Sequence, residues 1–152
     1  MSSRTLITFT ALGVISGLLF GLYLIDVKTT HQLVFVDGPS ISIVTEKFDF
    51  KKGEDITIRI INSGTVPLTF SDSSYGLKIT GLSGMLMYTP NNYQESDPGS
   101  YTLAPKEEIG FVWDQIKNDG DSTLEGLYKI YSKGLDPQNN KVEKSTTVTI
   151  WK

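Results

Sequence analysis

The chain has 152 residues, a formal net charge of −3, no cysteine and a single histidine. Without cysteine it has no disulfide, thiolate metal site or cysteine nucleophile, and a single histidine disfavours zinc, copper and haem sites. The acidic balance disfavours nucleic-acid binding and attachment to anionic headgroups through a basic patch.

The N-terminal part contains an uncharged apolar run at residues 5–25, between Arg4 and Asp26. As a helix, this run would be about 31 Å long, which matches the bilayer hydrocarbon core of about 30 Å. It is longer than the core of a cleaved signal peptide, and no A-x-A-like cleavage site follows it. We therefore expect a cytoplasmic tail at 1–4, a transmembrane signal anchor at 5–25, a linker at 26–31 and an extracytoplasmic domain at 32–152.

The orientation follows from the flanks of this run. Arg4 and the amino terminus carry positive charge on one side, while Lys28 stands close to Asp26 on the other. Positive charge favours the cytoplasmic side, and so does a short tail before a first span. We expect the N-terminus inside and the C-terminal domain outside the cytoplasmic membrane.

The predicted helix carries three glycines at intervals of four residues, Gly13, Gly17 and Gly21. Residues at this spacing share one helical face, and small residues there let a second helix approach closely. We expect this face to pack against another membrane helix, either of a second copy or of a different subunit. The alternative is that glycine is simply frequent in membrane helices.

Beyond the linker, short β-favouring runs alternate with turn residues, and no 3.6-residue apolar period is sustained. Residues 41–50 alternate, and the clearest strand is 55–62, whose isoleucines lie on one side. Its hairpin partner is expected at 66–70. Further strands are expected at 77–80, 85–88, 101–103, 109–113, 127–132 and 146–151. The spacing of the turns predicts an all-β antiparallel sandwich of about seven to nine strands.

Three stretches carry a family resemblance: FDFKKGEDITIRIINSG at 48–64, LAPKEEIGFVWDQ at 103–115 and EGLYKI at 125–130. An amphipathic strand ending in Asn, a turn before an aromatic-Trp strand and a Gly-x-Tyr strand start follow one another. This succession resembles the BsuPI-type intracellular proteinase inhibitor domain. The resemblance implies an immunoglobulin-like antiparallel β-sandwich and the inhibition of a protease. Both the strand pattern and the resemblance place Trp113 and Tyr128 on central strands, so these two residues are expected in the core.

Catalytic motifs are missing from the sequence. There is no G-x-S-x-G nucleophile elbow and no phosphate-binding glycine loop. His31, the only histidine, is interpreted as a solvated linker residue. We expect neither enzyme activity nor a cofactor.

Two polar loops are candidate sites. The segment 118–125 places Asp119, Asp121 and Glu125 close together, but it lacks the alternating ligand spacing of an EF-hand. A tight turn at Asp119-Gly120 is the favoured interpretation, with calcium binding as the alternative.

The other loop is the long polar segment 89–100. Its candidate protein-binding residues are Asn91, Asn92, Tyr93, Glu95 and Asp97. A tyrosine among small polar residues is typical of adaptable recognition loops, and an ordinary long connection is the alternative.

These features predict a non-catalytic, single-pass cell-envelope protein. It would be an accessory or structural subunit of a membrane complex, in contact with an extracytoplasmic protein and with other membrane helices. Two alternatives remain open: an extracytoplasmic protease inhibitor of BsuPI type, and a pilin-like filament subunit.

Overall fold

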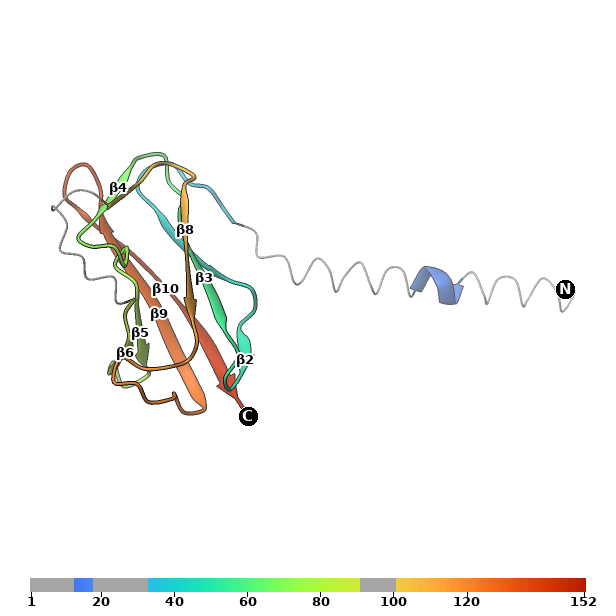
Figure 1. Ribbon diagram of the computed structural model, residues 1–152. Helices are drawn as coiled ribbons and strands as arrows, with labels where there is room; N and C mark the ends of the chain where they lie inside the picture. Colours follow the sequence, from blue (N-terminus) through green and yellow to red (C-terminus); the bar gives the residue numbers. More distant parts are fainter. Residues whose placement is uncertain (1–12, 18–32, 91–100) are drawn as a thin grey trace, which may run out of the picture. The chain divides into compact units, whose positions relative to one another are not determined.

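The computed structural model describes residues 13–17, 33–90 and 101–152, which Figure 1 draws as ribbons. The chain divides into two compact units, Met1–Gln32 and Leu33–Lys152. In the first unit, residues 13–17 are helical. Among the described residues, none belongs to a helix with the length and apolarity needed to cross a bilayer. Most of the predicted span at 5–25, the tail at 1–4 and the linker at 26–31 lie outside the described residues.

The second unit is all-β, as the sequence predicted, and its described strands form two sheets. The smaller sheet has the order β1-β3-β8, with bounds β1 (Ile41–Thr45), β3 (Ile56–Asn62) and β8 (Glu108–Trp113). The path of the larger sheet is β2 (Asp49–Lys51), β10 (Lys141–Trp151), β9 (Gly126–Leu135), β4 (Leu68–Phe70) and β7 (Tyr101–Leu103). Two more strands join it beside β9, namely β5 (Lys78–Gly81) and β6 (Leu86–Tyr88).

The strands of the larger sheet are joined around β9 and β10, which pair antiparallel over their full length. The other side of β9 is shared: β4 pairs at Leu135 and β5 pairs with residues 128–131. One pair departs from the predicted antiparallel arrangement, because β2 runs parallel to β10. β2 enters this sheet directly from β1 of the other sheet, so its direction is set by the crossover.

The predicted hairpin between 55–62 and 66–70 is wrong. β3 pairs with β1 and β8, whereas β4 lies in the other sheet. Asn62, fully buried, redirects the chain: its Nδ2 donates to the Val66 and Leu103 carbonyls, and its Oδ1 accepts from the Gly64 N–H. These bonds satisfy buried backbone groups where the chain changes sheets.

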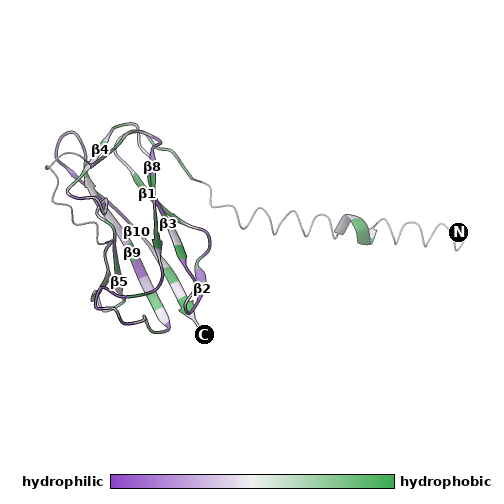
Figure 2. Ribbon diagram, viewed as in Figure 1, coloured by the Kyte–Doolittle hydropathy of each residue, from purple (hydrophilic) through white to green (hydrophobic). Residues whose placement is uncertain are grey.

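The core fills the space between the sheets. Alternate side chains of each strand point inward, which is the two-residue period read from the sequence. Trp113 and Tyr128 are buried as predicted, and their rings meet edge to face at a centroid separation of 5.7 Å. The buried apolar residues that pack together in this core are Ile41, Phe50, Ile56, Ile58, Ile60, Leu68, Phe70, Leu77, Ile79, Leu103, Trp113, Tyr128, Ile130, Val148 and Ile150. Figure 2 shows the green apolar segments along the strands.

The two ends of the sandwich differ in what they carry. Where β3 ends, the incoming chain is fixed by a bond from the Val36 N–H to the Ser63 carbonyl. We call this the entry end. At the opposite end, β9 begins after the loop 114–125, and the β5–β6 hairpin turns beside it. We call this the far end, which is the lower end in Figure 1.

Candidate functional site

The far end exposes large apolar side chains that belong to two neighbouring segments. Leu82 and Met85 in the β5–β6 hairpin are 71% and 61% exposed, and Leu124 in the loop 114–125 is 74% exposed. Scattered exposed apolar residues are ordinary, but a group of them around a hollow is typical of an interaction site.

A pocket of about 430 Å³ is lined by two of these side chains, Met85 and Leu124, together with their neighbours. Its apolar wall combines Met85 and Met87 from the hairpin with Leu124 and Tyr128 from the loop and β9. Lys117, Asp121 and Ser122 line the remaining side. We call this the methionine pocket.

The hairpin wall is held by a tight turn. The Gly81 N–H donates to the Met85 carbonyl, and the Gly84 N–H donates to Gly81. Gly84 has a φ of +82°, a conformation that glycine adopts without the strain a Cβ would bring. The opposite loop is tied to this wall, because the Asn118 N–H donates to the Met87 carbonyl at 2.9 Å.

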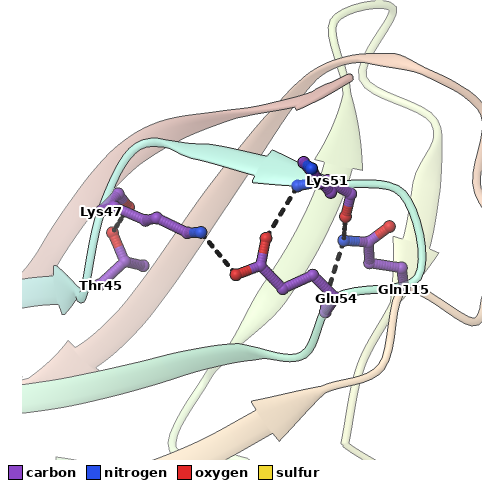
Figure 3. Close-up of polar contacts among 5 residues, drawn as sticks. All are labelled: Thr45, Lys47, Lys51, Glu54 and Gln115. Atoms are coloured by element: carbon purple, nitrogen blue, oxygen red, sulfur yellow. Dashed lines mark hydrogen bonds and ion pairs between the residues drawn. The ribbon is translucent and has the colours of Figure 1, made fainter. Parts of the chain in front are cut away.

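The side chain of Gln115 joins the loop 114–125 to the turn between β2 and β3 (Figure 3). Its side chain is buried, and its Nε2 donates to the carbonyls of Lys51 and Glu54 at 2.7 and 2.8 Å. Its Oε1 accepts from the Gly53 N–H at 2.8 Å. The β2–β3 turn and the pocket loop are therefore fixed to each other by one amide.

The remainder of the loop is equally constrained. Thr123 donates to the Gln115 carbonyl through both its N–H and its hydroxyl, each at 2.9 Å. The hydroxyl of Tyr128 donates to the Leu124 carbonyl at 2.6 Å. The indole N–H of Trp113 donates to Ile116 at 3.0 Å. Because these bonds fix the walls of the pocket, binding there requires little further ordering of them.

The polar side of the pocket is an internally paired charge group. Lys117 contacts the carboxylates of Asp119 at 3.1 Å and Asp121 at 3.3 Å. The hydrogen bond with Asp119 raises the pKa of Lys117. The backbone N–H of Asp121, and then Lys117, hold the pKa of Asp119 below its ordinary value. Two carboxylates against one ammonium leave this side acidic.

The turn interpretation of 118–125 is confirmed. The Lys117 N–H donates to the Asp121 carbonyl at 2.8 Å, and Gly120 occupies the left-handed region at a φ of +87°. Two of the three candidate carboxylates, those of Asp119 and Asp121, are bound to Lys117. Among the described residues, no three His, Asp or Glu side chains gather in a way that could hold a metal ion.

The other predicted site residues fall largely outside the described part of the chain. Gly13 and Gly17 lie in the helical segment, where an added Cβ would meet no heavy atom within 4 Å. Gly21, His31 and the candidate binding loop with Asn91, Asn92, Tyr93, Glu95 and Asp97 lie outside it. Helix packing and binding by that loop stay predictions.

The methionine pocket was missed from the sequence. The segments at 85–88 and 118–125 were recognised separately, as a strand and as a turn. The only available signal was the surplus of apolar residues at a hairpin tip, Leu82 and Met85, where polar residues are usual.

Comparison with known proteins adds little. No family model matches the chain, and no curated protein does. Among solved structures, the sporulation control protein Spo0M from Bacillus subtilis aligns with a TM-score of 0.42 and 14% identity, over 77% of this chain and 51% of its own. This chain thus spans about half the length of Spo0M. Superoxide reductase (neelaredoxin) from Ignicoccus hospitalis aligns with a TM-score of 0.40 and 10% identity, over 78% of this chain and 96% of the reductase chain.

Proposed function

We propose that this chain is a non-catalytic, single-pass envelope protein that acts through protein contacts, as an accessory or structural subunit of a membrane complex. Residues 5–25 anchor it in the cytoplasmic membrane with the N-terminus inside. The β domain lies outside and docks on a protein partner with its methionine pocket. The pocket, with its exposed apolar residues around fixed walls, is the observation that carries this proposal.

The pocket suits an apolar anchor residue of a partner. Met85 and Met87 can adapt their shape to an inserted side chain, because methionine is unbranched and polarisable. A pocket of about 430 Å³ accommodates one or two such side chains. The acidic side with Asp119 and Asp121 favours a partner that places a basic residue beside its apolar anchor.

The domain belongs, in this proposal, to the immunoglobulin-like sandwiches. Three features support it: a small β1-β3-β8 sheet, a larger sheet centred on β9 and β10, and β2 parallel to β10 after the crossover from β1. The bond from the Tyr128 hydroxyl to Leu124, four residues upstream at the start of β9, has the form of the tyrosine corner of these domains.

The location of the pocket also supports docking of a protein partner there. The chain enters the domain at the entry end, beside Ser63, while the pocket lies at the far end. Within residues 33–152, the first described residues therefore lie at the opposite end from the pocket and leave it accessible.

Full-length protein extracted from membranes in a mild detergent tests the proposal. We compare the proteins that co-purify with wild type and with a Met85→Glu, Leu124→Glu double variant. Both side chains are largely exposed, so the fold is kept, whereas two carboxylates in an apolar contact should reduce partner recovery by about tenfold or more. Val112→Glu, at a side chain 57% exposed on β8, is the matched control.

The remaining parts of the proposal have their own outcomes. Gly17→Ile should weaken association with other membrane subunits if the glycine face packs against a helix. Equal recovery by the pocket variant and the control would contradict docking at the pocket. Inhibition of a protease by the pure protein would favour the BsuPI-type alternative, and a processed N-terminus would favour the filament alternative.

A further inference from the structure

The outer face of the larger sheet carries four of the eleven lysines of residues 33–152, on the neighbouring strands β5, β9 and β10. The inward side chains of β9 include Tyr128 and Ile130, so the odd-numbered residues of β9 point outward. The registers place Lys78 beside Tyr131 and Thr147 beside Lys129. We call this surface the lysine face; its main residues are Lys78, Lys129, Tyr131, Lys133, Lys141 and Thr147.

The charges of this face are unbalanced. On β5, β9 and β10 the only carboxylate is Glu143, which pairs with Lys141 at 2.7 Å. Lys133 lies opposite Glu143 in the register. The side-chain bond from Lys141, and to a smaller extent the charge of Lys133, lowers the pKa of that carboxyl. Lys78 and Lys129 form no ion pair with a described carboxylate, and Lys78, Lys129 and Lys133 are all exposed. At the edge of the sheet, the opposite charges of Asp49 and Lys51 on β2 cancel each other. A chain of net charge −3 thus presents one basic face.

The same face also carries apolar and aromatic side chains. Leu127 and Leu135 stand at the two ends of β9, 44% and 37% exposed. Trp151 is 46% exposed, with the Lys51 ammonium 5.2 Å from its ring centroid. A shallow hollow of about 330 Å³ is lined by Lys129, Tyr131, Glu143, Lys144 and Ser145. Lysines interspersed with Trp, Tyr and Leu are typical of surfaces that rest at the headgroup level of a bilayer.

We propose that the lysine face lies against the anionic headgroups of the membrane that holds the chain. This inference rests on the proposed function, because the anchor brings the face to the lipid. The linker predicted at 26–31 spans at most about 20 Å, so the domain stays close to the headgroups at a high effective concentration. Attraction between lysines and anionic lipid, too weak to recruit a free domain, then suffices to orient a tethered one.

This orientation has a consequence for the methionine pocket. The strands of β9 and β10 lie along the membrane surface when their outer face contacts it. The pocket is at one end of these strands, so it opens sideways, toward proteins embedded beside the chain. Partners of the pocket are therefore expected among neighbours in the same membrane.

The full chain in lipid nanodiscs tests the inference. Because the sequence has no cysteine, single cysteines can carry a fluorophore: Thr147→Cys on the lysine face, and Val112→Cys on the smaller sheet as the control. Quenching by headgroup-labelled lipid reports contact. With phosphatidylglycerol present, we expect several-fold stronger quenching at position 147 than at 112, and its loss at about 1 M salt, where the Debye length is about 3 Å.

Charge reversal provides the second arm. Lys129→Glu with Lys133→Glu should abolish the difference in quenching, whereas Lys52→Glu with Lys106→Glu, the same change in charge elsewhere, should leave it. Equal quenching at positions 147 and 112 in inserted protein overturns the lysine-face inference alone. A chain that does not insert into nanodiscs overturns the proposed function, and the inference with it.

Discussion

Gln115 joins two segments that are far apart in the sequence through a single buried amide. Its side chain bonds the turn at residues 51–54, and its own carbonyl accepts twice from Thr123. It does so with a φ of +61°, a left-handed conformation that is uncommon for a residue with a side chain. Such a conformation persists only where the surroundings over-determine it.

Removal of this amide should be costly. In Gln115→Ala, two carbonyls and the Gly53 N–H lose a buried partner, so we expect a loss of about 2–4 kcal/mol in the free energy of unfolding. Chemical denaturation of the full chain in detergent measures it. Gln138→Ala, in the exposed turn between β9 and β10, is the same substitution without these bonds and should change stability by less than about 0.5 kcal/mol. Similar losses in the two variants would contradict the bracing role.

At the scale of elements, the sequence predicted the strands well and their partners less well. The alternation at 55–62 predicted β3, because a two-residue period sorts inward from outward side chains locally. The strands at 101–103 and 109–113 were predicted from β-favouring runs between turn residues. The segment 41–50 also alternates, yet it divides into β1 and β2 in different sheets. Alternation alone does not show which sheet a strand joins.

The hairpin predicted after Asn62 failed for a related reason. Asn-Ser-Gly is a good turn sequence, but the side chain of Asn62 bonds the Leu103 carbonyl, 41 residues away, and so directs the chain to the other sheet. The candidate site depended on the same kind of long-range information. Met87 and Asn118 meet only because β6 and the loop 114–125 lie side by side, which no local pattern indicates.

The turn between β9 and β10 gives the fold an acid dependence. The carboxylate of Asp136 accepts from the N–H groups of Gln138 and Asn140 and from the Asn140 side chain, at 2.8 to 3.0 Å. The side-chain bond from Asn140, followed by the backbone bonds, lowers the pKa of Asp136 below its ordinary value of 3.8. The charged form therefore stabilises the fold above pH 3.8, and this contribution is lost as the pH falls through the lower folded-state pKa.

We expect Asp136→Asn to destabilise the protein at neutral pH and to flatten the fall in stability on acidification. Asn140→Ala removes the principal bond and should act in the same direction. Denaturation midpoints measured between about pH 6 and pH 2 check both variants against wild type. If all three proteins lost stability in parallel over this range, Asp136 would have no part in the acid response.

At the scale of the whole molecule, net charge concealed how the charges are arranged. The net charge of −3 argued against a basic surface, but it describes the whole chain and not any one face. Lys129 and Lys133 are four residues apart, so a strand places them on one side, while Asp114, Asp119 and Asp121 gather in the loop before β9. Segregation of charge depends on strand register, which composition does not contain.

In the proposed function the anchor is the uncharged run at 5–25, and Ile15 stands at its middle. An aspartate at the centre of a spanning helix costs about 2.5–3.5 kcal/mol on insertion scales, and the loss of isoleucine adds about 0.5. Ile15→Asp should therefore lower the ratio of inserted to non-inserted chain by roughly a hundredfold to several hundredfold, since 1.4 kcal/mol is a factor of ten. The fraction of protein that resists alkaline extraction from membranes measures this ratio, with Ile15→Leu as the control.

The β domain, with its own core, should fold in both variants, so circular dichroism should show the same strand content. Equal resistance to extraction in Ile15→Asp and Ile15→Leu would mean that this run does not lie in lipid, and the lysine face would then have no membrane to meet.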